Sequence, residues 1–437
     1  MTKFTATLSK LILGPAIRLV MFASLLAGFG AGATLAQTRG YVTNQNDNTV
    51  SVIDTVTHSV IATVPVGLGP GAVAVSPNGR FAYVMNQLAN TVSVISAASN
   101  TVVATVPLGA FPTGIAMSAN GTFVYVTSSS ASNILVIDTA TNTVVTTIPV
   151  TLPFKLAIAP SGDLGYVTHG AFVNGVTVIN TASNSIVTDI PIPVDVTIAA
   201  EVTPNGAFVY VTCLSFTTGP KLAVIDTATK TVVAMVPLPA TFPPAVAITP
   251  DGAFAYVANN GGGVCCGGGG GASSVSVIDT ASNTEIATVP VGSPTGIAVT
   301  PNGAFVYVTN INDNTVSVMS TANNAVVAIL PVGNFPQSIV FGTLQPEPEP
   351  EPQPSLIARV EALIAGGALT LDQGAGLIDK VQQANAKLDA GQTGAACNQL
   401  SSFINQVIAF TGNGTLTPAQ GQPLIDAANA MKTSLGC

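Results

Sequence analysis

The sequence predicts an all-β seven-bladed propeller with a small C-terminal all-α helical domain. The first observation behind this prediction is a repeat: the seven tyrosines recur every 41 to 51 residues, at Tyr41, Tyr83, Tyr125, Tyr166, Tyr210, Tyr256 and Tyr307. The second is that each repeat contains short β-branched runs, which is typical of one four-stranded blade. The third is that the apolar residues change to a helical period after residue 355.

Residues 1–36 have the pattern of a secretory signal peptide. Lys3, Lys10 and Arg18 form a basic start, residues 19–36 carry no charge, and small residues precede Gln37. A retained membrane anchor is the alternative. We expect cleavage to leave an exported protein without a membrane segment, located in the periplasm, outside the cell or at the cell surface.

The last complete repeat shows the expected order of strands within a blade. Strands are predicted at residues 296–300, 304–308, 315–319 and 325–332, with a Pro-Asn-Gly turn between the first two. Their near-continuous apolar runs suit strands that are covered on both faces. The first repeat lacks its first strand, whereas residues 337–341 form a first strand without a successor. The C-terminal strand is therefore expected to complete the N-terminal blade and to close a propeller spanning residues 37–342.

The repeats resemble the YVTN family of β-propellers, which are secreted or surface-layer-associated proteins related in fold to seven-bladed lactonase-like propellers. The motif Tyr-Val-Thr-Asn occurs at residues 41–44 and 307–310, with variants at Tyr83, Tyr125 and Tyr166. The resemblance covers roughly residues 41–342. It implies a propeller scaffold and does not by itself imply a reaction.

The charge balance argues against nucleic-acid binding. Without the three basic residues of the signal segment, nine basic residues face twenty acidic ones, a net charge near −11. Between residues 41 and 342 the basic residues are Arg80, Lys155, Lys221 and Lys230. This distribution gives no basic footprint for phosphates. The chain also lacks tryptophan, the best platform for stacking bases or sugars.

One face of the predicted propeller is the candidate binding face. The turn between the first two strands of each blade has constant length, whereas the loop between the second and third strands varies, most of all at residues 213–221 and 259–274. Length variation and function both concentrate in surface loops, although unconstrained drift is the alternative. We call this face, which also carries the connections between blades, the variable-loop face. Its candidate ligand- or partner-binding residues are Phe111, Phe154, Phe242, Phe335, Asn259 and Asn260. The phenylalanines could instead wedge between blades as core.

Three of the five cysteines fall in the propeller. Cys213 is expected to begin one variable loop, and Cys265 and Cys266 lie in the next, so a bridge between adjacent blades is possible. A vicinal bridge or a thiolate metal site are alternatives. A zinc site lacks a fourth ligand, because His58 is expected on the opposite face.

The predicted channel strands show no recognisable catalytic constellation. By resemblance, lactonase-like propellers place acidic residues and asparagines around a channel metal, whereas here only Lys155, with Asp195 and Glu201 flanking the fourth such strand, is ionisable. No metal site and no cofactor are therefore expected. The series Asp54, Asp138, Asp226 and Asp279 follows the repeat period and is interpreted as a set of turn caps.

Residues 343–355 form a Pro/Glu-rich linker, and residues 356–437 form the predicted helical module. Four amphipathic segments are expected, with the last starting at Thr417-Pro418. Cys397 and Cys437 are expected to form a disulfide, because antiparallel helices would bring them together. The module resembles FIMAH-type helical modules, with Phe403-Ile-Asn-Gln-Val in place of the namesake motif.

These observations favour a secreted, monomeric and non-catalytic scaffold that binds an unknown protein or cell-envelope partner. A lactonase-type hydrolase is the alternative. Single-stranded nucleic-acid binding is a third, less favoured hypothesis.

Overall fold

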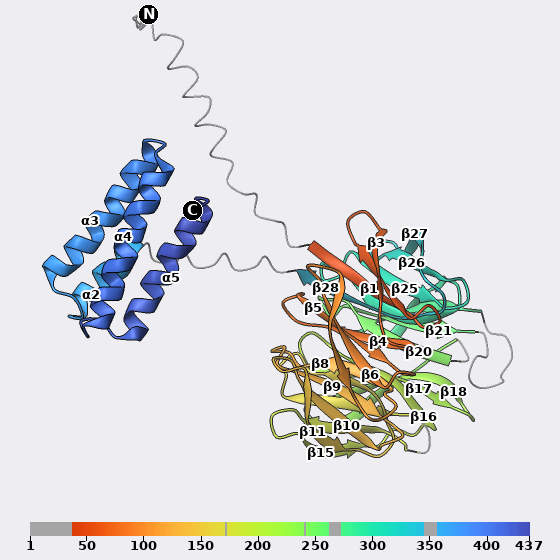
Figure 1. Cartoon of the computed structure of the whole chain (residues 1–437). Helices are drawn as coiled ribbons and strands as arrows, with labels where there is room; N and C mark the ends of the chain where they lie inside the picture. Colours follow the sequence, from red (N-terminus) through yellow and green to blue (C-terminus); the bar gives the residue numbers. More distant parts are fainter. Residues whose placement is uncertain (1–36, 171–172, 240–241, 262–271, 345–355) are drawn as a thin grey trace, which may run out of the picture. The chain divides into compact units, whose positions relative to one another are not determined.

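The computed structural model describes residues 37–170, 173–239, 242–261, 272–344 and 356–437. The predicted signal segment, the linker after residue 344, and Cys265 and Cys266 lie outside these residues. The chain divides near residue 346 into two compact units, a β propeller and a helical unit (Figure 1). The predicted fold class is confirmed.

The propeller consists of seven four-stranded antiparallel sheets. Their strands are, in chain order, β1 (Gln37–Asn44), β2 (Thr49–Asp54), β3 (Ser59–Pro65), β4 (Pro70–Val75), β5 (Phe81–Asn86), β6 (Thr91–Ser96), β7 (Thr101–Pro107), β8 (Gly114–Met117), β9 (Phe123–Ser128), β10 (Asn133–Asp138), β11 (Thr143–Pro149), β12 (Pro153–Ile158), β13 (Leu164–His169), β14 (Val176–Asn180), β15 (Ser185–Ile190), β16 (Val196–Val202), β17 (Phe208–Ser215), β18 (Gly219–Asp226), β19 (Thr231–Pro237), β20 (Phe242–Ile248), β21 (Phe254–Asn260), β22 (Ser274–Asp279), β23 (Thr284–Pro290), β24 (Pro294–Val299), β25 (Phe305–Asn310), β26 (Thr315–Ser320), β27 (Ala325–Pro331) and β28 (Pro336–Leu344).

The ring closes through the sheet with the order β28-β1-β2-β3 (Figure 1). In this sheet the last strand pairs with the first, so that Tyr41 lies opposite Val340 and Val42 lies opposite Ile339. The prediction that the C-terminal strand completes the N-terminal blade is confirmed. β28 extends to Leu344, three residues beyond the predicted strand.

Burial follows the position of each strand within its blade. The middle strands are almost fully buried, as in Val92 to Ile95 of β6, because neighbouring blades cover both of their faces. In the outermost strands, exposed and half-buried residues alternate. In β7 this pattern runs from Thr101 to Thr105, and Val106 is buried. The first strands of successive blades contact one another around the ring and form its inner wall. We call β28, β4, β8, β12, β16, β20 and β24 the inner strands.

The repeated tyrosines join each blade to the next. All seven are buried, at 2 % exposure or less. The Tyr210 hydroxyl donates to Oδ1 of Asn283 at 2.8 Å, and the Tyr256 hydroxyl donates to Oδ1 of Asn324 at 3.0 Å. Each asparagine lies in the following blade, in the turn between its third and fourth strands, with a positive φ of 53°. Asparagine tolerates this left-handed conformation better than most residues.

His58 replaces asparagine in this contact at the closing blade. Its Nδ1 lies 2.5 Å from the Tyr307 hydroxyl. The imidazole also packs edge-on against Phe305, with ring centroids 4.8 Å apart. The histidine thus links the last full blade, β24 to β27, to the blade that closes the ring.

The periodic aspartates cap turns. Oδ1 of Asp226 accepts from the backbone N–H groups of Ala228 and Thr229 at 3.0 and 2.8 Å. Asp138 makes the same pair of bonds, at 2.9 Å each, with Ala140 and Thr141. The backbone hydrogen bond from Thr229 lowers the pKa of the Asp226 carboxyl. These contacts explain why the aspartates follow the repeat.

The helical unit contains α2 (Leu356–Ala365), α3 (Leu371–Asp389), α4 (Thr393–Gly412) and α5 (Pro418–Ser434). Thr370 and Gln373 form a capping box at the start of α3, and Thr417 and Gln420 form one at the start of α5. The core includes Phe403, which is fully buried. None of the helices in the described part of the chain is long and apolar enough to cross a membrane.

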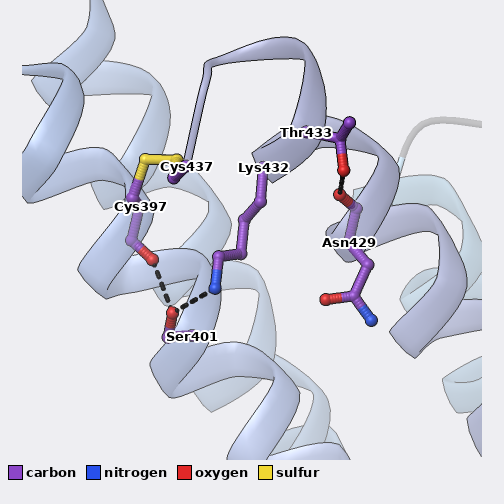
Figure 2. Close-up of a disulfide and its surroundings, with 6 residues drawn as sticks. All are labelled: Cys397, Ser401, Asn429, Lys432, Thr433 and Cys437. Carbon is purple, nitrogen blue, oxygen red and sulfur yellow. Dashed lines mark hydrogen bonds between the residues drawn. A yellow bond between two sulfur atoms is a disulfide. The ribbon is translucent and has the colours of Figure 1, made fainter.

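Cys397 of α4 and Cys437, beyond the end of α5, form a disulfide (Figure 2). Beside the bridge, Nζ of Lys432 donates to Oγ of Ser401 at 2.9 Å, and this hydroxyl donates to the Cys397 carbonyl at 2.8 Å (Figure 2). The predicted cysteine pair is therefore bridged, and the polar contacts fix α5 to α4 at the same end.

We predict that Tyr307→Phe lowers the free energy of unfolding by about 1 kcal/mol, because the variant leaves Nδ1 of His58 without its partner. The measurement is the denaturant midpoint of the propeller transition. His58→Asn is the matched variant, since asparagine makes this contact in other blades, and it should stay close to the parent. An unchanged midpoint for Tyr307→Phe would show that the seam does not depend on this contact.

We predict that replacing both Cys397 and Cys437 by serine destabilises the helical unit by about 4 kcal/mol, from the chain entropy of a closed loop of this length. The loop spans a sequence separation of 40 residues. Loss of helical circular dichroism with denaturant is the readout. Cys213→Ala, which removes an unbridged propeller thiol, is the control and should leave the helical transition in place.

Candidate functional site

A cavity of about 470 Å³ lies in the channel of the ring. All seven blades line it, mainly through the first residues of the inner strands, such as Gly71 to Val73 of β4 and Gly296 and Ile297 of β24. The first residues of the inner strands follow the connections between blades. The cavity therefore lies on the variable-loop face, and its volume is in the range of about 300–1,000 Å³ that is usual for small-molecule sites.

Three of the four candidate phenylalanines line this cavity: Phe154, Phe242 and Phe335. Each is only half-buried, so the rings present accessible apolar surface. Phe111 does not line the cavity and is 42 % exposed. Its carbonyl accepts from Ser128 Oγ at 2.9 Å.

The two candidate asparagines, Asn259 and Asn260, have different roles. They are consecutive residues of β21, and consecutive side chains of a strand point to opposite faces. Asn260 lines the cavity. The Asn259 amide donates to Oγ of Ser276 at 2.7 Å, as Asn310 does to Ser317 at 2.9 Å, so it holds the blade together.

Lys155 spans part of the cavity. Its Nζ donates to the Pro244 carbonyl at 2.9 Å, so the side chain reaches from β12 past β16 to β20. The Phe154 ring centroid is 6.0 Å from the same Nζ. Desolvation by the surrounding blades lowers the pKa of the half-buried ammonium to about 8. Among the described residues that line the cavity, no other is ionisable.

Lys155 has no counterpart in the other blades. The equivalent positions of the inner strands carry small residues, namely Ala72, Gly114, Ala199, Ala245, Gly296 and Ser338. A Cβ added at Gly114 would lie 2.8 Å from the Phe154 carbonyl oxygen, and one at Gly296 would lie 2.8 Å from that of Gln337. The inner strands thus approach too closely there for a side chain in every blade.

Glu201 is the only other ionisable residue of the inner strands. It follows Ala200, the last residue of β16 that lines the cavity, and lies opposite Tyr210. The same register position holds Ala74, Ala116, Ala157, Ala247, Ala298 or Val340 in the other blades. Its side chain is exposed although the strand is internal, which places it in the channel. Desolvation by the enclosing ring raises the pKa of its carboxyl to about 7.

Phe335 has a strained backbone beside the cavity, with a φ of +60°. Its N–H donates to Oδ1 of Asn314 at 2.9 Å, just as the N–H of Gly69 donates to Asn48 in the next blade at 2.9 Å. Gly69 has a φ of +64°, so a phenylalanine occupies a position for which glycine is suited. Such a conformation costs a non-glycine residue on the order of 1 kcal/mol or more, and Leu152, at the same position before β12, also adopts it with a φ of +45°.

A row of three glutamines forms a polar part of the cavity wall. Nε2 of Gln337 donates to Oε1 of Gln45 at 2.8 Å, and Nε2 of Gln45 donates to Oε1 of Gln87 at 3.3 Å. Gln87 and Gln337 line the cavity. Hydrogen-bonding amides therefore face the cavity from the closing blade and its neighbour.

The interpretation of Cys213 as the start of a loop is wrong. Cys213 lies within β17, is fully buried, and pairs with Lys221 of β18. The residues taken as a long loop are mostly an extension of this hairpin, with Ser215 paired to Gly219. Burial raises the pKa of the unbridged Cys213 thiol to about 12, so it is not poised to react.

The described residues contain no group of three or more His, Cys, Asp or Glu side chains that could hold a metal ion. Asp195 directly precedes β16, as expected, and its side chain accepts from the Phe216 N–H at 2.7 Å.

Residues 37–162 match the family described as lactonase, 7-bladed beta-propeller. The match covers the strands from β1 to β12. A second comparison finds 62 % identity over 37 residues to the PE-PGRS family protein PE_PGRS18 of Mycobacterium tuberculosis. That segment is 8 % of this chain, and the chain spans only 8 % of the length of that relative.

Solved structures share the propeller fold. The hydrazine synthase of Kuenenia stuttgartiensis is similar with a TM-score of 0.57 and 24 % identity, covering 64 % of this chain and 92 % of that one. A functionally unknown protein from Desulfotomaculum acetoxidans is similar with a TM-score of 0.59 and 16 % identity, covering 70 % of this chain and 99 % of that one. The dihydro-heme d1 dehydrogenase NirN is similar with a TM-score of 0.54 and 15 % identity, covering 69 % of this chain and 74 % of that one. At these identities the likeness concerns the fold.

The expectation of a non-catalytic propeller is corrected by these comparisons. The family that matches the first blades is named for an enzyme, and two of the similar structures are named as enzymes, a hydrazine synthase and a dehydrogenase. The absence of a carboxylate cluster had argued against catalysis. Single ionisable residues such as Lys155 and Glu201 can also support catalysis, without a cluster of carboxylates.

Proposed function

We propose that this chain is a hydrolase of the lactonase type that acts in the channel cavity. The observation that carries the proposal is the match of residues 37–162 to a seven-bladed lactonase family. The cavity supports it, because it combines apolar walls with the Lys155 ammonium, and Glu201 follows Ala200, the last residue of β16 that lines it.

In the proposed reaction the Lys155 ammonium donates a hydrogen bond to the carbonyl oxygen of a lactone. Only one of its N–H groups is needed for the Pro244 carbonyl, so two remain for a ligand. A cation held in this way stabilises the negative charge that develops on the oxygen in the transition state.

Glu201 is the proposed proton acceptor. It takes a proton from water as the water oxygen bonds to the carbonyl carbon. The bond from this carbon to the ring oxygen then breaks, and the ring oxygen leaves as a hydroxyl group after receiving the proton from Glu201. Each lactone consumes one water molecule and gives one hydroxy acid, which then ionises. A carboxyl with a raised pKa suits this role near neutral pH.

We also propose that the protein is exported and that its ring and helical unit are of the YVTN and FIMAH types. The disulfide between Cys397 and Cys437 supports export, since such bridges persist in oxidising compartments. A surface-layer or cell-envelope location fits this proposal, with the helical unit as the part that contacts an envelope partner. Affinity capture with separate full-length and helix-truncated proteins tests that assignment.

We predict that Lys155→Met lowers kcat/KM for lactone hydrolysis by about 10²-fold or more, because it removes the group that stabilises the oxyanion. A panel of γ- and δ-lactones, followed by acid release, supplies the measurement. Lys387→Met, which removes an exposed lysine of α3, is the control and should retain full activity. Equal turnover by the parent and Lys155→Met would remove Lys155 from the mechanism.

We predict a bell-shaped pH dependence of kcat/KM with its maximum between about 7 and 8. Glu201 has a raised pKa, so the carboxylate that accepts the proton is lost as the pH falls through about 7. Lys155 has a lowered pKa, so its cation is lost as the pH rises through about 8. Glu201→Gln should remove the acidic limb, and a parent profile that is flat from pH 6 to pH 9 would contradict both assignments.

A further inference from the structure

The walls of the cavity and its single charge together restrict the ligand that it can hold. The half-buried rings of Phe154, Phe242 and Phe335 form apolar surface, and Ile311 adds to it. Burying such surface against an apolar group releases water from both, which favours binding by roughly 25 cal/mol per Å². A ligand with only polar groups would leave these rings without a partner.

The charge in the cavity is confined to one point. Lys155 is held by the Pro244 carbonyl, so its Nζ is fixed near β20 and not free to extend into solvent. Among the described residues, no acidic side chain lines the cavity, so the lining itself supplies no carboxylate to pair with the ammonium. A half-buried cation without a counter-ion gains most from an anionic ligand group.

We infer that the cavity takes a lactone with an apolar side chain and retains the ring-opened product, an amphipathic hydroxy carboxylate, with its carboxylate at Lys155 and its apolar chain against the phenylalanines. This inference rests on the proposed function, since hydrolysis of a neutral lactone creates this carboxylate. The product therefore binds more tightly than the lactone, and product release limits turnover.

Phe335 positions the apolar end of this ligand. Its positive φ is kept although the equivalent Gly69 shows that the turn forms without a side chain. The ring lies in the connection that precedes β28, whereas Lys155 lies on β12, three blades away. This separation lets one ligand reach the cation with its head and the Phe335 ring with its tail.

The test measures binding of 4-hydroxydecanoate to the full-length protein by calorimetry, without any need for turnover. Two probes each lack one part of 4-hydroxydecanoate. Decane-1,4-diol lacks the charge, and 4-hydroxybutanoate lacks the apolar chain. We expect each to bind at least 10-fold more weakly than 4-hydroxydecanoate. The affinity of 4-hydroxydecanoate should fall as the pH rises through about 8, because Lys155 then loses its proton.

Variants identify the groups responsible. Lys155→Met should weaken 4-hydroxydecanoate binding at least 10-fold and leave the diol unchanged, and Lys155→Arg should restore much of the affinity. Phe335→Gly places glycine at a φ that it adopts freely, so the propeller should still fold. This variant should weaken the binding of 4-hydroxydecanoate and of decane-1,4-diol to the same extent. The thermal unfolding of each variant verifies folding.

Two results would overturn the inference. Equal affinity for the diol and the acid would show that Lys155 does not bind the carboxylate, and equal affinity for 4-hydroxybutanoate would show that the phenylalanines do not contribute. The proposed function fails separately. If 4-hydroxydecanoate binds as expected but no lactone is hydrolysed, the ligand class stands and the hydrolase does not. If lactones are hydrolysed but 4-hydroxydecanoate does not bind as expected, the hydrolase stands and the ligand class does not.

Discussion

The antiparallel pairing of β1 with β28 holds the ring in one piece. Each of the other six blades is continuous in the chain, whereas the closing blade joins segments about 300 residues apart, with Thr38 opposite Thr343. Without this pairing, both strands would present unpaired N–H and C=O groups at an edge. The faces of the two flanking blades would also lose their cover. The hydroxyls of Tyr125, Tyr210, Tyr256 and Tyr307 then add hydrogen bonds to the following blade, between blades that are already in contact.

Closure also determines what the channel can contain. Seven inner strands converge on one axis, and the contacts of Gly114 and Gly296 with neighbouring carbonyl oxygens show how closely they pass. At the positions equivalent to Lys155 and to Glu201, the other six blades carry shorter side chains or glycine. Lys155 and Glu201 occupy two successive levels, each alone among alanines, glycines or other small residues. The ring therefore isolates two ionisable groups, and the same enclosure shifts both pKa values towards neutrality.

The fold was predictable because its signals are local and repeated. The tyrosine period, the constant turns and the missing first strand define the blades and their closure without any knowledge of contacts. The helical spacing around Cys397 likewise sufficed to pair it with Cys437. The aspartate caps could be separated from a catalytic series because a shared period indicates a shared structural role.

The site was less accessible to sequence analysis because it depends on contacts between blades. The reach of Lys155 to Pro244 passes one whole blade, and no local pattern encodes that distance. The difference between Asn259 and Asn260 depends on the exact register of β21, since a shift by one residue exchanges their faces. The strain at Phe335 could have been suspected, because the matching connection before β4 has glycine at this position. Lys155 and Glu201 stood out as the only charges on strands of small residues, and that contrast was the available signal.

The order of synthesis gives the closing blade a further significance. β1 is made first, but its partner β28 is made only after the twenty-six strands between them. Until β28 has been made and has paired, the first blade can have only three of its strands, and β1 has an open edge. Such an edge is a template for pairing with other chains. A chain that ended before Pro336 would lack β28 and would keep the edge of β1 open to such pairing.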